Sequence, residues 1–380
     1  MKILFNATTN VIGGGVKNSA IFIKRAVEEP SCDWTFAVSD QVFALTKELG
    51  VDPARTEAFS QSPARCKQSR RRLLSLAENT RPDLVYTMAG PAYVRFPFLH
   101  VLGLSNAYVT HADLKSIALG RTIFGLTKTI FESAYKLHQA RRADFWIFQT
   151  QAARDGFCRR AFISPARTEV VSNAVDTEFV DRFERQSDTS PDAARQNGAV
   201  IFVPAAPYRH KALTSIPSIA RELDTQLNGR IDFRFVLTID PSHSLWGEIE
   251  SKANKLGVKH RVVTGGAYSY LDAASRYSAA DIVFIPSILE TFSVTFLETF
   301  ASSRPLVAAD RAFARDICGD AARYVDPFCP GAAAATFKDL LENIARRNLL
   351  VRNGRERLMR FPDHRLRFEN IMVVLKTFAG

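Results

Sequence analysis

The sequence has 380 residues, 46% of them hydrophobic and 23% charged. That length exceeds one ordinary hydrophobic core and predicts two domains, and the composition is that of an ordinary globular protein. The formal net charge is +11, and residues 1–180 hold 23 Lys and Arg against 16 Asp and Glu, a net of +7. A basic first half favours an anionic partner such as phosphate, nucleic acid or a membrane, although a solvated basic surface without a partner is the alternative.

The cysteines are odd in number and scattered, and no two of them form a C-x-x-C pair. They are Cys32, Cys66, Cys158, Cys318 and Cys329. This pattern argues against a disulfide framework and a thiolate zinc site, and it favours a reducing compartment. The start, MKILFNATTN, is too short in apolar residues for a signal peptide and predicts a strand. No window approaches 18 uncharged apolar residues, so we expect a cytoplasmic protein without a membrane span.

Short apolar runs alternate with helical patterns along the first half of the chain. Segments between the runs have helical spacing, as in 17-KNSAIFIKRAVEE-29. The predicted strands are 2–6, 34–38, 83–88, 107–111, 145–150 and 169–173. This alternation is typical of a parallel sheet with crossover helices.

The polar stretch 181–198 interrupts the alternation and predicts a linker. The pattern then resumes, and the strands predicted in the second half are 199–204, 233–239, 261–266, 281–287, 305–310 and 323–327. We therefore predict two Rossmann-like α/β domains, 1–180 and 199–360, whose parallel sheets face a central cleft.

Three glycines follow the first predicted strand in 12-IGGGVKNS-19. They would let the backbone approach a ligand closely, and the N–H groups of the following helix would face an anion. The stretch does not complete G-x-G-x-x-G, because Asn18 stands at the third position. The signal for a nicotinamide dinucleotide is weak, and a plain tight turn is the alternative.

Two further stretches place polar residues where ligands bind in open α/β sheets, at the carboxyl ends of strands. His111 ends the predicted strand 107–111 and is suited to hydrogen-bond a hydroxyl or a carbonyl oxygen; a structural histidine is the alternative. In 207-PYRHKALTSI-216, Arg209 and Lys211 precede a predicted helix. Two cations beside a helix N-terminus suit a diphosphate, with an ordinary solvated loop as the alternative.

Two glutamates frame 290-ETFSVTFLE-298, which follows a predicted strand. Glu290 is expected in a turn, and Ser293 as the N-cap of a helix over 294–303 that contains Glu298. Both carboxylates would point into a crevice at the carboxyl edge of the sheet; two exposed surface acids are the alternative. The backbone N–H groups expected at the same place are those of Phe292, Ser293 and Val294.

Together these segments resemble the retaining glycosyltransferases of the GT-B fold, family 4. The E-x(7)-E element of that family, after a strand ending in Pro-Ser, stands in 280-ADIVFIPSILETFSVTFLETFASSRPLVAAD-310. The stretch 263-VTGGAYSYLDAASRYSAAD-281 is similar to its base-binding loop and following helix. The remaining matches are 317-ICGDAARYVDP-327, 170-VVSNAVDTEFV-180 and 209-RHKAL-213. The resemblance covers nearly the whole chain and is most specific over 263–327. We also expect a C-terminal helix over 361–380 that crosses back to the first domain.

The resemblance implies a role for each matched residue. Glu298 would bind the ribose hydroxyls of a nucleotide sugar, and Glu290 would contact the donor sugar near the transferring carbon. Lys211 and Arg209 would neutralise the leaving diphosphate, and His111 would hydrogen-bond the sugar. The further residues implied in nucleotide-sugar binding are Gly13, Gly14, Gly15, Asn173, Gly265, Gly266, Phe292, Ser293 and Val294. Thr291 and Ser293 replace two glycines of the family pattern, which puts the loop geometry in question.

The function so implied is retaining transfer of a sugar from a GDP- or UDP-sugar to a hydroxyl of a saccharide or lipid-linked saccharide, as in cell-surface polysaccharide or O-antigen assembly. The sequence contains no Asp-x-Asp pair, so we expect a hexosyltransferase-like enzyme without metal or other cofactor. A retaining glycosidase is rejected, because the resemblance puts one of the two carboxylates at the ribose. The alternatives are another GT-B enzyme, such as a sugar-nucleotide epimerase or a phosphorolytic enzyme, and a basic nucleic-acid-binding protein, although no nucleic-acid recognition motif is present.

The segment 115–142 is basic and amphipathic, with six Lys or Arg, one Glu and apolar residues at roughly helical spacing. Such a helix can rest on an anionic membrane. We therefore expect a protein that docks peripherally at the inner leaflet and reaches a lipid-linked acceptor. A helix packed on the core through its apolar side, with a solvated basic face, is the alternative.

Overall fold

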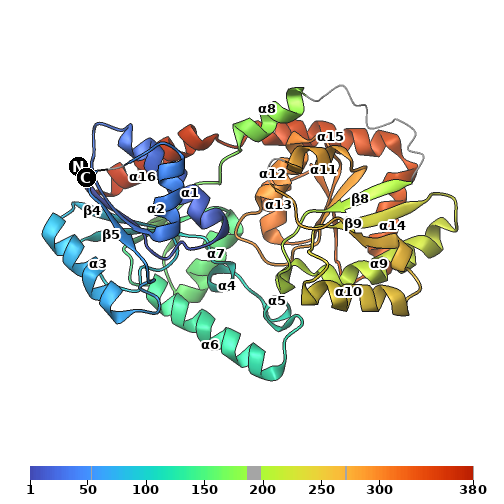
Figure 1. Cartoon of the computed structure of the whole chain (residues 1–380), viewed down its shortest axis with the longest axis horizontal. Helices are drawn as coiled ribbons and strands as arrows, with labels where there is room; N and C mark the ends of the chain where they lie inside the picture. The colour runs from blue at the N-terminus through green and yellow to red at the C-terminus, as the bar shows by residue number, and fades with distance from the viewer. Residues whose placement is uncertain (53, 186–197, 270–271, 380) are drawn as a thin grey trace. The chain divides into compact units, whose positions relative to one another are not determined.

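The computed structural model describes residues 1–52, 54–185, 198–269 and 272–379, and it divides into two compact units (Figure 1). Unit 1 comprises 1–113, 122–174 and 362–380, and unit 2 comprises 114–121 and 175–361. The units therefore separate at Val175, and the short segment 114–121 belongs to unit 2, where the expected boundaries left it in the first domain. Each unit is built on its own parallel sheet, as the predicted α/β class requires.

Unit 1 has a seven-stranded sheet in the order β3-β2-β1-β4-β5-β6-β7. Its strands are β1 (Lys2–Ala7), β2 (Asp33–Ser39), β3 (Thr56–Phe59), β4 (Leu84–Ala89), β5 (Leu99–Leu104), β6 (Phe145–Phe148) and β7 (Thr168–Val170). Its helices are α1 (Gly13–Val27), α2 (Asp40–Glu48), α3 (Lys67–Thr80), α4 (Ala107–Thr110), α6 (Ile123–Ala140), α7 (Gln151–Ala161) and α16 (His364–Ala379). The central strands β1 and β4 are buried on both faces almost throughout, as expected where helices cover both sides of a parallel sheet.

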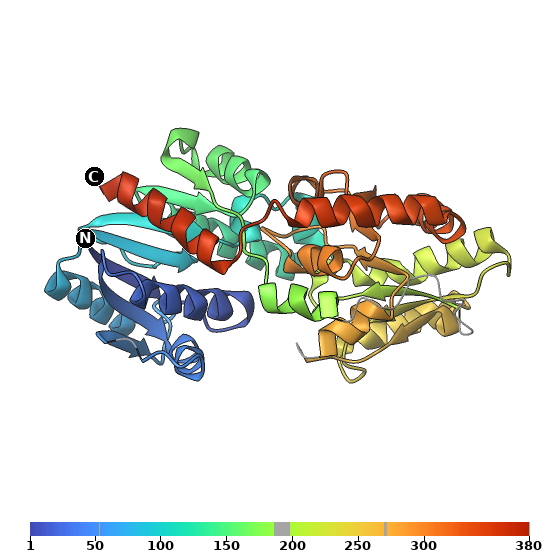
Figure 2. The ribbon, with the colours of Figure 1, turned by 90° about the horizontal axis from the view of Figure 1, so that it is seen from above.

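The last helix of the chain, α16, completes the core of unit 1. It contacts α1 and β4 of that unit (Figure 2). The ring of Phe368 lies 5.0 Å from that of Phe22. Ile371, Met372 and Leu375 are buried in the same cluster. The helix therefore buries its apolar side in unit 1, although it follows unit 2 in the sequence.

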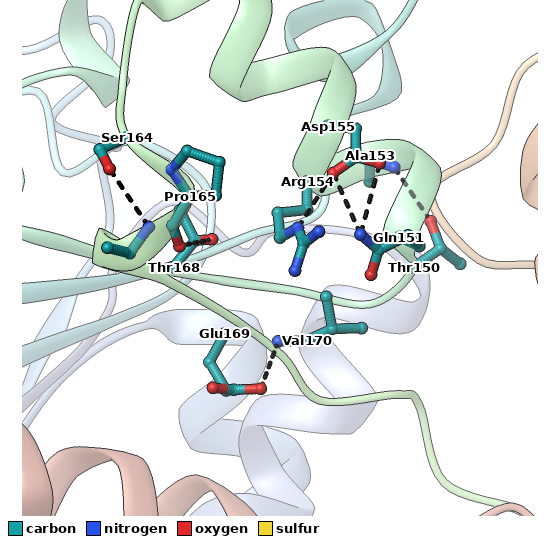
Figure 3. Close-up of polar contacts among 11 residues, drawn as sticks. Thr150, Gln151, Ala153, Arg154, Asp155, Ser164, Pro165, Thr168, Glu169 and Val170 are labelled. Carbon is teal, nitrogen blue, oxygen red and sulfur yellow. Dashed lines mark hydrogen bonds and ion pairs between the residues drawn. The ribbon is translucent and has the colours of Figure 1, made fainter.

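In the β6–α7–β7 crossover of unit 1, hydrogen bonds between residues close in the sequence fix the start of the helix. Thr150 follows β6, and its hydroxyl accepts the Ala153 N–H at 3.2 Å, which caps the first turn of α7 (Figure 3). Within that turn, the Gln151 amide donates to Asp155 at 3.1 Å. At the far end, the Thr168 hydroxyl donates to the Pro165 carbonyl at 2.7 Å, just before β7 pairs with β6.

Unit 2 has a six-stranded sheet in the order β10-β9-β8-β11-β12-β13. Its strands are β8 (Ala199–Val203), β9 (Phe233–Leu237), β10 (Val262–Thr264), β11 (Ile282–Ile285), β12 (Leu306–Ala309) and β13 (Ala322–Val325). Its helices are α5 (Leu114–Ala118), α8 (Thr177–Arg185), α9 (Ile216–Leu227), α10 (Ser244–Lys255), α11 (Ala273–Ser278), α12 (Val294–Ala301), α13 (Ala312–Cys318), α14 (Pro330–Glu342) and α15 (Ile344–Leu358). In the described part of the chain, no helix is long and apolar enough to cross a bilayer.

Several predicted elements differ from the observed ones. The predicted strand 107–111 is wrong, because this segment forms the one-turn helix α4. The Arg160 guanidinium donates to the Tyr108 carbonyl within α4 at 2.9 Å and to the Ala112 carbonyl just beyond it at 2.8 Å. Strands β3 and β5 were not predicted. The predicted linker 181–198 begins inside α8, and its residues 186–197 lie outside the described residues.

Candidate active site

The strand order of unit 2 reverses between β8 and β11, which pair directly. From β8 the chain proceeds to β9 and β10 on one side, and from β11 to β12 and β13 on the other. Loops that leave neighbouring strands in opposite directions leave a crevice at the carboxyl edge, where ligands bind in such sheets. Here the two loops meet, because the Ile288 N–H donates to the His210 carbonyl at 2.9 Å.

Lys211 and Glu290 form an ion pair at this reversal point. The ammonium group of Lys211, from the loop after β8, contacts Oε1 of Glu290, from the loop after β11. The two side chains are only 11% and 17% exposed, so the pair is shielded from most of the solvent. His210 approaches the same carboxylate at 4.0 Å. Burial lowers the pKa of His210, while the charge of Glu290 acts in the opposite direction.

A compact turn carries Lys211 to its place. Arg209–Lys211 is a single 3-10 turn that ends at Ala212, whose φ of +50 redirects the chain into a second turn, Leu213–Ser215. Ala212 is buried against Ile288. The loop after β8 is therefore pinned to the loop after β11 by packing as well as by the ion pair.

Arg209, two residues before Lys211, has a different partner. Its guanidinium forms two hydrogen bonds of 2.7 Å with the carboxylate of Glu248 on α10. Both side chains of this pair are about half exposed. The structure thus brings Lys211 to Glu290, and it engages Arg209 elsewhere.

Glu298 lies one turn into α12, where a buried tyrosine holds it. The hydroxyl of Tyr277, on α11, donates to Oε2 of Glu298 at 2.8 Å. Burial raises the pKa of Tyr277, and the neighbouring Glu298 charge raises it further, so Tyr277 remains a hydrogen-bond donor at neutral pH. The same two causes raise the pKa of Tyr268. The sequence analysis did not find Tyr277, whose place in a helical pattern resembles that of any core aromatic.

The loop between the two glutamates does not need the glycines of the family pattern. Ser293 has a φ of −109, and Thr291 is not among the residues with positive φ, so side chains are accommodated without backbone strain. Ser293 stands at the predicted N-cap of α12, but its hydroxyl bonds to that of Thr295 at 2.7 Å and caps no backbone N–H. The ring of Phe292 packs 5.9 Å from that of Phe361.

Gly265 and Gly266 follow β10 at the same edge of the sheet. The Gly265 N–H donates to the Leu237 carbonyl at 2.8 Å, and Gly266 has a φ of +72. A Cβ on Gly265 would lie 3.0 Å from the Arg276 guanidinium and 3.1 Å from Val236. Gly266 therefore requires glycine for its positive φ, and Gly265 requires it for the close packing of its neighbours.

In unit 1 the glycines Gly13, Gly14 and Gly15 form the first turn of α1 instead of a loop before the helix. Gly13 has a φ of +63, and no neighbouring atom would meet a Cβ on Gly13 or Gly14. Asn173 lies near the same helix, and its side-chain oxygen accepts a hydrogen bond of 3.3 Å from Asn18.

His111 ends the helical turn α4 instead of the predicted strand. Its Nδ1 lies 2.8 Å from the Thr110 hydroxyl. Gly156 on α7 lets this histidine pack closely, since a Cβ there would lie 2.5 Å from the His111 Cβ. The sequence analysis did not single out Gly156, although a lone glycine inside a helical pattern is a signal of such close approach.

Known proteins resemble this chain in sequence and in fold. Residues 246–357 match the family model for glycosyl transferases group 1. The MMP alpha-(1->4)-mannosyltransferase of Mycolicibacterium hassiacum is 25% identical over 198 residues, which are 51% of this chain and 44% of that protein. The D-inositol 3-phosphate glycosyltransferase of Corynebacterium kroppenstedtii is 28% identical over 230 residues, 58% of this chain and 50% of that protein. The chain thus spans about half the length of these curated relatives.

Solved structures match along the whole chain. Anabaena Alr3699/HepE in complex with UDP has a TM-score of 0.71 at 16% identity, covering 99% of this chain and 100% of that one. Sucrose-phosphate synthase from Thermosynechococcus elongatus has a TM-score of 0.69 at 15% identity, with coverages of 99% and 98%. At such identities the likeness shows the fold. The fold expected from the resemblance is confirmed: the chain has the GT-B fold, and its residues 246–357 match the model for glycosyl transferases group 1.

Proposed function

We propose that the protein is a retaining glycosyltransferase that moves a sugar from a UDP- or GDP-sugar to a hydroxyl of a saccharide or lipid-linked saccharide, without a metal ion. The observation that carries the proposal is the shielded Lys211–Glu290 pair at the reversal point of a group 1 domain, with Glu298 eight residues further along. Two relatives that are named as sugar transferases support it, as does a neighbour of the same fold in complex with UDP-glucose.

The proposed donor contacts follow from the chemistry of each group. Lys211 has three N–H donors, so it can contact Glu290 and a diphosphate oxygen together. The Tyr277 hydroxyl holds one oxygen of Glu298, which orients the carboxylate for two ribose hydroxyls. In the proposal, the Glu290 carboxylate stabilises the positive charge that develops on the sugar ring. From unit 1 the proposal assigns His111 to the sugar and Gly13–Gly15 to the phosphates.

The proposed reaction needs no covalent intermediate. The bond between the anomeric carbon and the phosphate oxygen breaks, and its electron pair stays on the diphosphate. The acceptor oxygen attacks the face that the diphosphate leaves, and its proton passes to a diphosphate oxygen. Configuration is therefore retained. A fixed cation stabilises the leaving group, so EDTA is expected to leave the rate unchanged; abolished activity that manganese restores would refute the metal-free part.

A thermal-shift screen of UDP, GDP, ADP and dTDP, followed by their sugars, tests the proposal. The correct nucleotide at a hundredfold excess over its Kd adds about 2.7 kcal/mol to the free energy of unfolding. DNA should produce no shift. The anomeric configuration of the product, read by NMR, then tests retention. If none of the nucleotides or nucleotide sugars shifts the melting temperature or is consumed, the proposal fails.

A further inference from the structure

Helix α6 presents its large apolar side chains to solvent. Ile123, Phe124 and Phe131 are 84%, 79% and 75% exposed, and Ile130 and Tyr135 are about half exposed. These five residues are here called the α6 face. Phe124 and Phe131 are seven residues apart, as are Ile123 and Ile130, and Tyr135 follows Phe131 by four, so all five lie along one side of the helix. A face of two phenylalanines, two isoleucines and a tyrosine costs solvation free energy unless something covers it.

The fold of unit 1 uses little of the α6 face: the ring of Tyr135 lies 6.1 Å from that of Tyr93, and Ile123, Phe124 and Phe131 stay largely exposed. The helix is anchored at its other end, where Ala140 is buried beside Trp146 and its carbonyl accepts the indole N–H at 2.9 Å. Leu137 packs against the same cluster. The alternative of a helix packed on the core therefore holds at the Leu137–Ala140 end of α6, and not along the α6 face. The predicted single segment 115–142 is wrong, since α5 belongs to unit 2 and α6 to unit 1.

The charges on α6 indicate what covers this face. Lys128 lies between Phe124 and Phe131 along the helix and is exposed, and Arg141 and Arg142 are exposed where the helix ends. With Lys136, residues 123–142 carry four Lys or Arg and one acid, Glu132. A second copy docked symmetrically would set these cations against one another. An anionic bilayer accepts both the apolar side chains and the cations around them.

We propose that the α6 face is a membrane-docking surface that inserts its aromatic and aliphatic side chains into the interface of an anionic lipid bilayer. The helix lies in the plane of the interface, with Phe124 and Phe131 among the upper acyl carbons and Lys128 at the phosphates. Tyr135, with a polar tip on an apolar body, suits the headgroup level. If the proposed glycosyl transfer is correct, docking brings unit 1 to a lipid-linked acceptor, but the docking itself does not depend on it.

Vesicle flotation tests this proposal. Wild-type protein should float with vesicles of phosphatidylcholine containing about one third phosphatidylglycerol and stay unbound with phosphatidylcholine alone. Phe124→Ser with Phe131→Ser should lower the bound fraction about tenfold, because the lost apolar burial is the main contact. Phe162→Ser is the matched control: Phe162 is 87% exposed in the same unit but lies off α6, and its loss should change nothing. In 1 M salt, where the screening length falls to about 3 Å, binding to the anionic vesicles should also weaken.

Two results would overturn the proposal. One is that the wild type fails to float with anionic vesicles, or that the double variant floats equally well. The other is that sedimentation shows a dimer which the double variant dissociates, without any flotation, so that a second copy covers the face. Nucleotide-induced thermal shifts, measured on all variants, establish that each is folded and report separately on the proposed function.

Discussion

The carboxyl edges of the two sheets carry different chemistry. In unit 2 the loops present charged side chains that are already paired, Lys211 with Glu290, and Glu298 with Tyr277. In unit 1 the matching positions present glycines at the start of α1 and a histidine packed against Gly156. Unit 2 is thus suited to recognise a ligand by charge and hydrogen bonds, and unit 1 by close approach of its backbone. Substitutions at Glu290 and Glu298 of unit 2 should therefore act on chemistry and binding, and a substitution at Gly156 of unit 1 on packing.

The largest effect is expected at the shielded ion pair. Glu290→Ala should lower the transfer rate by roughly 10²–10³-fold, because a charge positioned at the reacting carbon acts in the transition state. Nucleotide affinity, measured by calorimetry, should hardly change. Glu250 on α10 forms an ion pair with Lys259, so Glu250→Ala serves as the control and should leave the rate unchanged. Full activity of Glu290→Ala would remove this residue from the mechanism.

A smaller effect, on binding first, is expected at Glu298. Its replacement by Ala should weaken nucleotide affinity by roughly 10–100-fold, the loss of charge-assisted hydrogen bonds to two hydroxyls. Tyr277→Phe keeps the carboxylate but frees its orientation, so the loss should be only about fivefold. Calorimetric titration with the nucleotide found in the screen measures both. The division of roles between the two glutamates would be refuted if Glu290→Ala weakened nucleotide binding more than Glu298→Ala did.

The packing of unit 1 is tested at Gly156. An added Cβ would lie 2.5 Å from the His111 Cβ and 2.7 Å from the Thr110 carbonyl, so Gly156→Ala should cost about 1–3 kcal/mol of unfolding free energy. The helical Gly247 of unit 2 has nothing within 4 Å of an added Cβ. Gly247→Ala should therefore stabilise by about 0.5–1 kcal/mol. Denaturant titrations compare the two, and equal effects would mean that close approach at His111 is unimportant.

The smallest effect is expected at Arg209. Its pair with Glu248 is about half exposed, and such pairs contribute about 0–1 kcal/mol to stability. Arg209→Ala should change the melting temperature little and lower the transfer rate less than Lys211→Ala does. A loss as large as that of Lys211→Ala would show that Arg209 exchanges Glu248 for the donor during the reaction.

Much of the unit 2 site was predictable, because it lies in loops directly after apolar strands. The Glu290 turn and helix α12 follow from a strand end and from helix signals that are local in the sequence. Gly265 and Gly266 stood inside the predicted strand 261–266, whereas β10 ends at Thr264, and their role was implied only by the resemblance. The helical turn at 107–111 was not predictable from such local signals. Its Tyr, Val and Thr favour a strand, but Arg160, some fifty residues further along, stabilises a helical turn there through the carbonyls of Tyr108 and Ala112.

The sequence by itself determined the two parallel α/β units and the helix that carries Glu298, since apolar runs and helix starts depend on neighbours along the chain. Only the tertiary structure decided that Lys211 reaches Glu290 while Arg209 reaches Glu248, because side chains two residues apart in a turn point to different elements. It also decided that the α6 face is exposed. An amphipathic pattern has the same period whether its apolar side meets the core or the surroundings, so only the packing of α6 could distinguish the two.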